Sequence, residues 1–468
     1  MNKKGFYITT AIDYVNDVIH IGHAYQKVVA DVLARYHRLK GEKVFFLTGS
    51  DEHGSKAEEA AKAVGQEVSW FVDQIVAENK DQLSALDIGF DRYIRTTDKD
   101  HLEKVKDLYL RIKEAGDIYQ ARFEGFYCLG CEEYKTVSDL DDNGRCPLHP
   151  NLPIKKLAEN NYFFAWSKYQ EFLKDHIRNN PDFIKPKSRA REMLAFLDQG
   201  LSDISISRQN VTWGILVPND SSQTLYVWFD ALINYLTGAP KGFWPADLHL
   251  LGKDNTRWHA LLWPAMLKSA NLPLPKTIYA HGFLTLNDQK ISKSLGNIIR
   301  PKELVEKFGS DGARYLLVSA KTLAGDGDIS WIKMKAKYNA DLANGLGNLT
   351  ARLSRLCQLS KQDFKVSYPS LLDKNQKTFV DLMDDYKIFD ALTLIWKEIS
   401  LIDQEINQAQ PWQIKNKKRL KEVLLGLITQ MLTVNLKLEP FLPQATTIIR
   451  ETFLAKKIIS PKPLFIRK

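Results

Sequence analysis

The first 115 residues alternate short apolar runs with longer amphipathic stretches, and this alternation constrains the fold more than any other feature. Strand-like runs are expected at residues 6–11, 44–48 and 93–96. Helix-like stretches lie at residues 22–39, 55–64, 68–86 and 99–115. Parallel strands need crossover connections, which helices supply. The sequence therefore predicts an α/β fold with a doubly wound, Rossmann-like parallel sheet.

The rest of the chain divides into segments of different character. Residues 116–220 hold clustered cysteines, turns and prolines, which indicates an insertion. Strand signals resume at residues 224–228, 248–251 and 277–280, with a helix at about 255–270, and the pattern is helical from residue 331. We expect two halves of the sheet domain (1–115 and 221–285), a connective insertion (116–220), a linker domain (286–335) and an all-α bundle (336–468).

The composition is that of a soluble protein with several modules. The chain has 468 residues, of which 44% are hydrophobic and 26% charged. It contains no uncharged apolar run of 18 residues, so no membrane span is expected. Its N-terminus has no apolar signal core. We therefore expect a cytoplasmic protein.

Positive charge is concentrated in the C-terminal third. Residues 331–468 contain 23 Lys and Arg against 13 Asp and Glu, whereas the rest of the chain is nearly neutral. A basic module beside a neutral one indicates a polyanionic partner such as a nucleic acid. The alternative is a lysine-rich surface that only keeps the protein soluble.

The motif His20-Ile21-Gly22-His23 follows the first expected strand and opens the first expected helix. A parallel sheet presents its nucleotide crevice at this point, and a helix start offers unpaired N–H groups to phosphate. His20 and His23 can donate hydrogen bonds to phosphate oxygens, and Gly22 leaves room for a purine ring. Four residues alone could equally be structural.

A second motif, Lys290-Ile291-Ser292-Lys293-Ser294, follows the last expected strand of the sheet. Two lysines three residues apart, with small hydroxyl residues between and after them, are typical of a cationic loop. Such a loop can neutralise the charge that grows on a transferring phosphoryl group. Alone, it could also be an ordinary solvated loop.

Four potential metal ligands lie close together inside the expected insertion. Cys128 and Cys131 form one pair, and Cys146 and His149 form another after fourteen intervening residues. Three thiolates and one imidazole suit tetrahedral zinc and leave no open coordination position, so we expect a structural site. The fourth cysteine, Cys357, lies in a helical stretch and is expected in the core.

The histidine and lysine motifs, in this order, resemble the signature pair of class I aminoacyl-tRNA synthetases. The resemblance implies that ATP, accompanied by Mg²⁺, binds between the two motifs. An amino-acid carboxylate then attacks the α-phosphate, and a tRNA ribose hydroxyl attacks the resulting adenylate. By this resemblance, the transition state is stabilised by His20, His23, Lys290 and Lys293.

Further segments are similar to methionyl-tRNA synthetases over nearly the whole chain. They are 7–16, Gly49-Ser50-Asp51-Glu52-His53-Gly54, 227–235 and Gly252-Lys253-Asp254, with His259 and Trp263 behind them. Aromatic side chains can select a thioether by shape and polarizable contact. The resemblance implies a methionine pocket formed by Ile12, Tyr14, Asp51, Trp228, Ala231, Leu232, Tyr235, His259 and Trp263. It also implies that Asp51 pairs with the substrate ammonium, and that Gly252 and Asp254 contact the ATP ribose region.

Three pocket positions depart from the usual pattern of these relatives, and Ile291 in the second signature replaces a methionine, apolar for apolar. Ala11 replaces a proline, Asp13 replaces a tyrosine, and Asn255 replaces a pocket isoleucine. These changes concern the shape of the pocket and leave the reaction class intact.

The helical C-terminal region also resembles the anticodon-reading part of this family. The resemblance implies that Asn348, Arg352 and Trp412 bind the anticodon of tRNA(Met), since unpaired bases stack on aromatic rings and bond to amides and guanidinium groups. This agrees with the local charge excess. The chain has no segment that resembles the dimer-forming domain some relatives append, so a monomer is expected.

Three alternatives remain at this point. Another class I synthetase for an apolar or sulfur-containing amino acid would share both signature motifs. A non-catalytic tRNA-binding paralogue would not form any adenylate. A small-molecule adenylyltransferase uses paired histidines before a helix but lacks a basic helical module.

Overall fold

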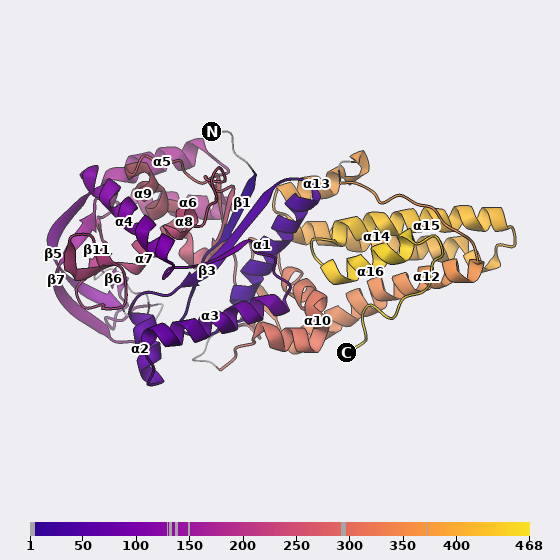
Figure 1. Cartoon of the computed structure of the whole chain (residues 1–468), viewed down its shortest axis with the longest axis horizontal. Coiled ribbons are helices and arrows are strands. Elements are labelled where there is room, and N and C mark those ends of the chain that lie inside the picture. Colours follow the sequence, from indigo (N-terminus) through magenta and orange to yellow (C-terminus); the bar gives the residue numbers. More distant parts are fainter. Residues whose placement is uncertain are drawn as a thin grey trace. The chain divides into compact units, whose positions relative to one another are not determined.

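The computed structural model describes residues 5–128, 130, 133–135, 139–147, 150–291, 296–371 and 373–468. The chain forms two compact units, each assembled from separated segments (Figure 1). The first contains Met1–Ile19, Phe45–Asp81 and Phe90–His281, and the second contains His20–Val44, Gln82–Gly89 and Gly282–Lys468. This division assigns the helix after the first strand to the same unit as the C-terminal bundle.

A seven-stranded sheet organises the first unit. Its order is β2–β3–β1–β13–β14–β8, with β4 beside β3. The bounds are β1 (Phe6–Thr10), β2 (Asp13–Tyr14), β3 (Val44–Asp51), β4 (Arg92–Arg95), β8 (Ile184–Lys185), β13 (Leu248–Gly252) and β14 (Thr277–His281). β1 and β13 pair in parallel with Ile8 opposite Leu248, and β13 pairs in parallel with β14. The predicted α/β fold with a parallel sheet is confirmed.

Amphipathic helices accompany this sheet and bury one face each. In α4 (Lys99–Glu114), the buried side chains of Val105, Leu108, Tyr109 and Ile112 recur at helical spacing. They join a core that includes Tyr7, Phe229 and Trp263. The other helices here are α2 (Ser55–Ala63), α3 (Val68–Ala85), α5 (Gln170–Asn179), α6 (Lys187–Asp198), α7 (Val227–Ala231), α8 (Asn234–Thr237) and α9 (Trp263–Ser269).

The segment expected as an insertion is mostly antiparallel. β5 (Ile118–Cys128) and β7 (Ile154–Phe164) form a long hairpin, which β6 (Glu133–Lys135) and β9 (Ile204–Ser205) extend. β10 (Ser207–Arg208), β11 (Leu216–Val217) and β12 (Asp220–Leu225) make a smaller sheet. β8 also comes from this segment, yet it pairs with β14 in the main sheet. The segment is therefore not separate from the catalytic sheet.

One expected strand is wrong in its second half. β12 ends at Leu225, and α7 begins at Val227. Val227, Trp228 and Phe229 are β-branched or aromatic and favour a strand by composition. The backbone N–H of Asp230 instead donates to the carbonyl of Tyr226, which starts a helical turn. Tertiary packing overrides local preference in such short apolar runs.

The second unit is mainly helical. It contains α1 (Ile21–Leu39), α10 (Pro301–Val318), α11 (Trp331–Lys337), a π-helical stretch η6 (Tyr338–Gly347), α12 (Asn348–Ser360), α13 (Lys377–Asp384), α14 (Ile388–Ala409), α15 (Lys417–Leu438) and α16 (Pro443–Leu454). α14 packs on α15, and α15 on α16. The helical pattern expected from residue 331 is interrupted between α13 and α14, where Tyr386 has a φ of 60°. No helix within the described ranges is long and apolar enough to cross a bilayer.

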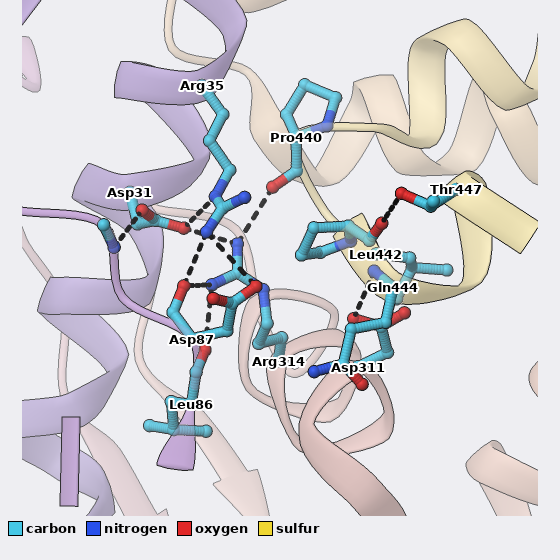
Figure 2. A network of polar contacts seen from close by, with 12 residues as sticks. Asp31, Arg35, Leu86, Asp87, Asp311, Arg314, Pro440, Leu442, Gln444 and Thr447 are labelled. Atoms are coloured by element: carbon cyan, nitrogen blue, oxygen red, sulfur yellow. Dashed lines mark hydrogen bonds and ion pairs between the residues drawn. The ribbon is translucent and has the colours of Figure 1, made fainter. Parts of the chain in front are cut away.

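A buried arginine ties three segments of the second unit together (Figure 2). Arg314 in α10 is fully buried, and its Nη2 lies 2.7 Å from Oδ2 of Asp31 in α1. Its other N–H groups donate to the carbonyls of Leu86, Asp87, Pro440 and Phe441 at 3.0–3.3 Å. A guanidinium has five N–H groups, so all of them have partners here.

Candidate active site

The first signature motif forms the N-terminus of α1. His20 is the N-cap residue, and its Nδ1 accepts a hydrogen bond from the backbone N–H of Gly22 at 3.0 Å. The backbone N–H of His20 donates in turn to Nδ1 of His23 at 3.3 Å. The two imidazoles lie with ring centroids 4.0 Å apart. A Cβ atom on Gly22 would lie 2.8 Å from Cε1 of His20, so a side chain there would displace this ring.

This capping geometry decides which ring nitrogens carry hydrogen. Both Nδ1 atoms accept backbone N–H bonds, so each neutral imidazole carries its proton on Nε2. A pair of Nε2–H donors then stands at the positive end of the α1 dipole. Such an arrangement can bind phosphate oxygens.

The segment that carries the second motif begins as a β-hairpin. β15 (Leu284–Leu286) and β16 (Gln289–Lys290) are joined by Asn287 and Asp288, both with positive φ, as a tight hairpin turn requires. Lys290 therefore ends β16, directly before the loop. Lys293 lies outside the described residues.

A backbone hydrogen bond connects the two signature segments. The N–H of Ile21 donates to the carbonyl of Ile299 at 3.0 Å. Ile21 stands between the two histidines, and Ile299 lies six residues beyond Lys293. The segment that follows the second motif is thus hydrogen-bonded to the first residue of α1, and both belong to the second unit. Two residues 278 positions apart in the sequence are therefore in contact.

The residues predicted for methionine binding lie in the first unit, where several aromatic rings cluster. Trp228 stacks on Trp258 with centroids 5.1 Å apart, and it meets the ring of His259 edge-on at 6.1 Å. The ring of Tyr235 lies 6.2 Å from that of Trp263. Ala231 and Leu232 are buried on the same short helical segment as Trp228. Ile12 is partly buried against the same core.

A hydrogen-bonded pair lies within this cluster. The Oη atom of Tyr235 is 2.6 Å from Nε2 of His259, and Nδ1 of His259 is 3.0 Å from the carbonyl oxygen of Asn255. Because a carbonyl can only accept, Nδ1 carries the proton and Nε2 accepts from the tyrosine. Burial lowers the pKa of His259 to about 4, so this histidine is neutral near pH 7.

Asp51 and Tyr14 are neighbours in the sheet. Tyr14 in β2 stands opposite Asp51, the last residue of β3. Asp51 is 5% exposed. Gly252 and Asp254 lie where β13 ends, and Asp254 is exposed. The carboxyl ends of parallel strands are where open α/β sheets bind ligands.

A buried cluster joins two of the predicted segments, and no pattern in the sequence indicates it. Asp230 in α7 lies 2.6 Å from Nδ1 of His53 and 2.7 Å from Nε2 of His101. Burial alone would raise the pKa of Asp230, but the two imidazoles outweigh it and hold the pKa below its usual value. These residues stand 48 to 177 positions apart, so only the fold reveals their contact.

Only part of the predicted zinc site is described. Cys128 ends β5, and both Cys128 and Cys146 are buried. Cys146 is notable because the residues on either side of it, Arg145 and Pro147, are exposed. Cys131 and His149 lie outside the described residues. Among the residues that the structure describes, no three His, Cys, Asp or Glu side chains are arranged to hold a metal ion.

The residues predicted to read an anticodon lie on the helical bundle. Trp412 is 54% exposed, unusually so for this residue type. The guanidinium of Arg352 lies 5.6 Å from the Trp412 ring centroid and donates to Asp403 and Asn407. Asn348 is exposed one turn before Arg352. All three side chains therefore belong to one face of the bundle.

Comparisons with known proteins agree with these features. The profile of the family described as "tRNA synthetases class I (M)" matches residues 6–151 and 138–354. The methionine–tRNA ligase of Caldanaerobacter subterraneus subsp. tengcongensis is 39% identical, with 94% of this chain and 72% of the relative aligned. That of Nostoc sp. is 40% identical, with 96% and 89% aligned.

A solved structure gives the same result. The Mycobacterium tuberculosis methionyl-tRNA synthetase in complex with methionyl-adenylate superposes with a TM-score of 0.92 at 35% identity. The alignment covers 99% of this chain and all of that structure. The profile, the curated relatives and this structure all point to the same group. The chain therefore belongs to the methionyl-tRNA synthetase family of class I aminoacyl-tRNA synthetases.

Proposed function

We propose that this chain activates L-methionine with ATP and transfers it to the 3′ end of tRNA(Met). The observation that carries the proposal is the likeness, over 99% of the chain, to a synthetase structure that holds methionyl-adenylate. The histidine pair at the start of α1 and the aromatic cluster around Tyr235 and His259 supply the matching chemistry.

In the first step, a methionine carboxylate oxygen attacks the α-phosphorus of ATP, and the bond to the bridging oxygen breaks. Pyrophosphate leaves and methionyl-adenylate remains. His20 and His23 donate from Nε2 to the phosphate oxygens, beside the positive end of the helix dipole. Lys290 and Lys293 balance the charge on the departing pyrophosphate. Mg²⁺ bound with ATP supplies further charge neutralisation.

In the second step, a ribose hydroxyl at the tRNA 3′ end attacks the carbonyl carbon of the adenylate. The ester forms, the bond to the phosphate oxygen breaks, and AMP leaves. The protein contributes positioning and electrostatic stabilisation and forms no covalent bond of its own.

Methionine is selected by shape and by polarizable contact. Trp228, Trp263, Ile12 and Leu232 provide apolar contact for the uncharged side chain, and the Tyr235 hydroxyl is held in place by neutral His259. A thioether is polarizable and packs well against such rings. Asp51, which lies opposite Tyr14 in the sheet, pairs with the ammonium group through its carboxylate.

Two glycines and an aspartate are assigned to ATP. Gly22 is the second residue of α1, and without a side chain it lets a purine approach the helix backbone. Gly252 and Asp254 lie at the end of β13, and an exposed carboxylate there can accept hydrogen bonds from ribose hydroxyls. The end of β13 follows the rule that nucleotides bind at the carboxyl edge of a parallel sheet.

The anticodon stacks on Trp412 and bonds to Arg352 and Asn348. The exposed indole and the adjacent guanidinium support this assignment, because a large exposed aromatic ring suits an unpaired base. The assigned domain limits, the cytoplasmic location and the monomeric state remain predictions from the sequence.

A structural zinc ion at Cys128, Cys131, Cys146 and His149 is part of the proposal. The two thiols that the structure describes fit such a site, because both are buried, and Cys146 is buried although the residues on either side of it are exposed. Zinc bound by these four side chains would cross-link the two ends of this segment.

Amino-acid-dependent exchange of labelled pyrophosphate into ATP tests the function. We expect exchange with L-methionine and little with cysteine, leucine or isoleucine. Strong exchange with another amino acid would show that this amino acid, and not methionine, is the substrate. No exchange with any amino acid would favour a non-catalytic tRNA-binding protein. Exchange without subsequent tRNA charging would favour an adenylyltransferase.

A further inference from the structure

A cavity of about 380 Å³ lies between η6, α12 and the end of the chain. Its volume falls within the range of ordinary ligand sites, about 300–1,000 Å³. One wall is helical and carries Asn344 and Asn348, and the other is formed by residues 463–467, including Phe465 and Arg467. Asn348 is a predicted anticodon residue, but the resemblance assigns no role to the opposite wall.

Small residues keep the floor of this cavity open. Ala343, Gly347 and Ala351 follow one another at four-residue spacing along η6 and α12. A Cβ atom on Gly347 would lie 3.0 Å from the carbonyl of Leu342 and 3.7 Å from Cδ2 of Phe465. Gly347 also ends the π-helical stretch, a conformation that often occurs at functional sites.

The terminal segment is held in place at several points. The side-chain amide of Asn339 donates to the carbonyl of Lys468 at 3.0 Å, and the N–H of Lys468 donates back to Asn339 at 2.9 Å. Phe465 meets the buried ring of Tyr338 edge-on at 6.1 Å. These contacts make the segment a fixed wall.

The polar groups around the cavity are available to a ligand. Asn344, Asn348 and Arg467 are exposed, and their side chains form no hydrogen bond or ion pair with any residue that the structure describes. Asn344, Asn348 and Arg352 lie one turn apart on the same helical face, and Arg352 contacts Trp412. The cavity thus continues the face assigned to the anticodon.

We propose that this cavity binds one unpaired nucleotide of the tRNA anticodon loop, with the C-terminal segment as its second wall. Asn344 and Asn348 offer amide donors and acceptors to a base edge, Phe465 offers an apolar surface to the base, and Arg467 pairs with the adjoining phosphate. This rests on the proposed function and adds Asn344, Phe465 and Arg467 to the residues that contact tRNA.

Three variants of the full chain test the proposal, with an anticodon stem-loop RNA as the probe. Arg467→Gln removes the cation, Asn344→Ala removes the amide, and Ala351→Leu fills the floor without removing a polar group. Lys462→Gln is the matched control, because Lys462 is an exposed cation in the same segment and does not line the cavity. Unchanged melting temperatures would show that all four variants fold.

We expect Asn344→Ala and Ala351→Leu to weaken RNA binding about tenfold or more, in the range of a lost base contact. Arg467→Gln should lower the slope of log affinity against log salt by about 0.7, the loss of one single-strand phosphate contact. Lys462→Gln should do neither. Methionine-dependent pyrophosphate exchange should stay unchanged in all four variants.

If Arg467→Gln and Lys462→Gln change the salt dependence of RNA affinity equally, the effect is general charge attraction and the proposal is overturned. Unchanged RNA binding by Ala351→Leu would do the same, because a filled cavity cannot hold a base. If Trp412→Ala binds RNA normally as well, the anticodon assignment itself fails. If Trp412→Ala weakens RNA binding and only the cavity variants are neutral, the anticodon assignment stands and the cavity does not bind a nucleotide.

Discussion

Replacing Arg314 with methionine should strongly destabilise the second unit. The substitution keeps most of the side-chain volume but removes five hydrogen-bond donors from a fully buried position (Figure 2). Asp31 would keep two contacts, from Nε of Arg35 at 2.7 Å and from the N–H of Gly89 at 2.8 Å. The four carbonyl groups would lose the donors that Arg314 supplies.

The expected cost follows from burial. Removing one partner of a buried ion pair typically costs about 3–5 kcal/mol, and the remaining contacts of Asp31 place this case within that range. For a unit of this size, one kcal/mol lowers the melting temperature by roughly 2–4 °C. We therefore expect the melting temperature to decrease by about 10 °C, as measured by calorimetry of the full chain.

Arg35→Met is the matched control, because Arg35 contacts the same carboxylate from a partly exposed position. Its side chain is 25% exposed, so solvent screens the pair, and its loss should cost only about 1–2 kcal/mol. If both variants melt at the same temperature, burial does not govern the strength of this junction and the reasoning is refuted.

Four further predictions concern the assigned sites. Lys293→Ala should slow adenylate formation far more than it weakens methionine binding, and equal losses would contradict a role in the transition state. Trp412→Ala should abolish most tRNA charging while pyrophosphate exchange continues; normal charging would remove the anticodon assignment. A zinc chelator should expose residues 116–160 to proteases, whereas an unaltered cleavage pattern would argue against a structural metal. Because the pKa of His259 is lowered to about 4, the folded protein binds fewer protons than the unfolded chain between about pH 4 and 6.5. Its free energy of unfolding should therefore fall as the pH decreases through that window. A His259→Gln variant that loses as much stability over the same pH range would contradict this.

The sequence predicted the parallel sheet and its helices because their signals are local. The apolar runs of β1, β13 and β14 and the helical periodicity of α1 and α4 lie within single segments. The expected strand at 224–228 failed in part, since the same β-branched and aromatic residues can fill a buried helical turn. The break at Tyr386 was missed for a similar reason, because a single positive φ leaves the apolar period on either side intact.

The candidate site was predicted by resemblance more than by chemistry, and the structure shows why. The two signature motifs are recognisable as short patterns, and the bond between Ile21 and Ile299 brings their segments together. No pattern indicates that Asp230 lies between His53 and His101, because each is an ordinary residue in its own segment. The same holds for Arg314, whose five partners come from three separated stretches of the chain.

The chemistry assigned to the two units differs in kind. Methionine selection in the first unit depends on packing and on a neutral histidine, so it should be insensitive to salt. Phosphate stabilisation and tRNA binding, assigned to the second unit, depend on imidazole donors, lysines and arginines, and they should weaken with ionic strength. Mutations in the first unit should therefore change selectivity among amino acids, and mutations at the start of α1 or in the lysine motif should change the rate of adenylate formation. The reason is that substrate binding and transition-state stabilisation depend on different residues.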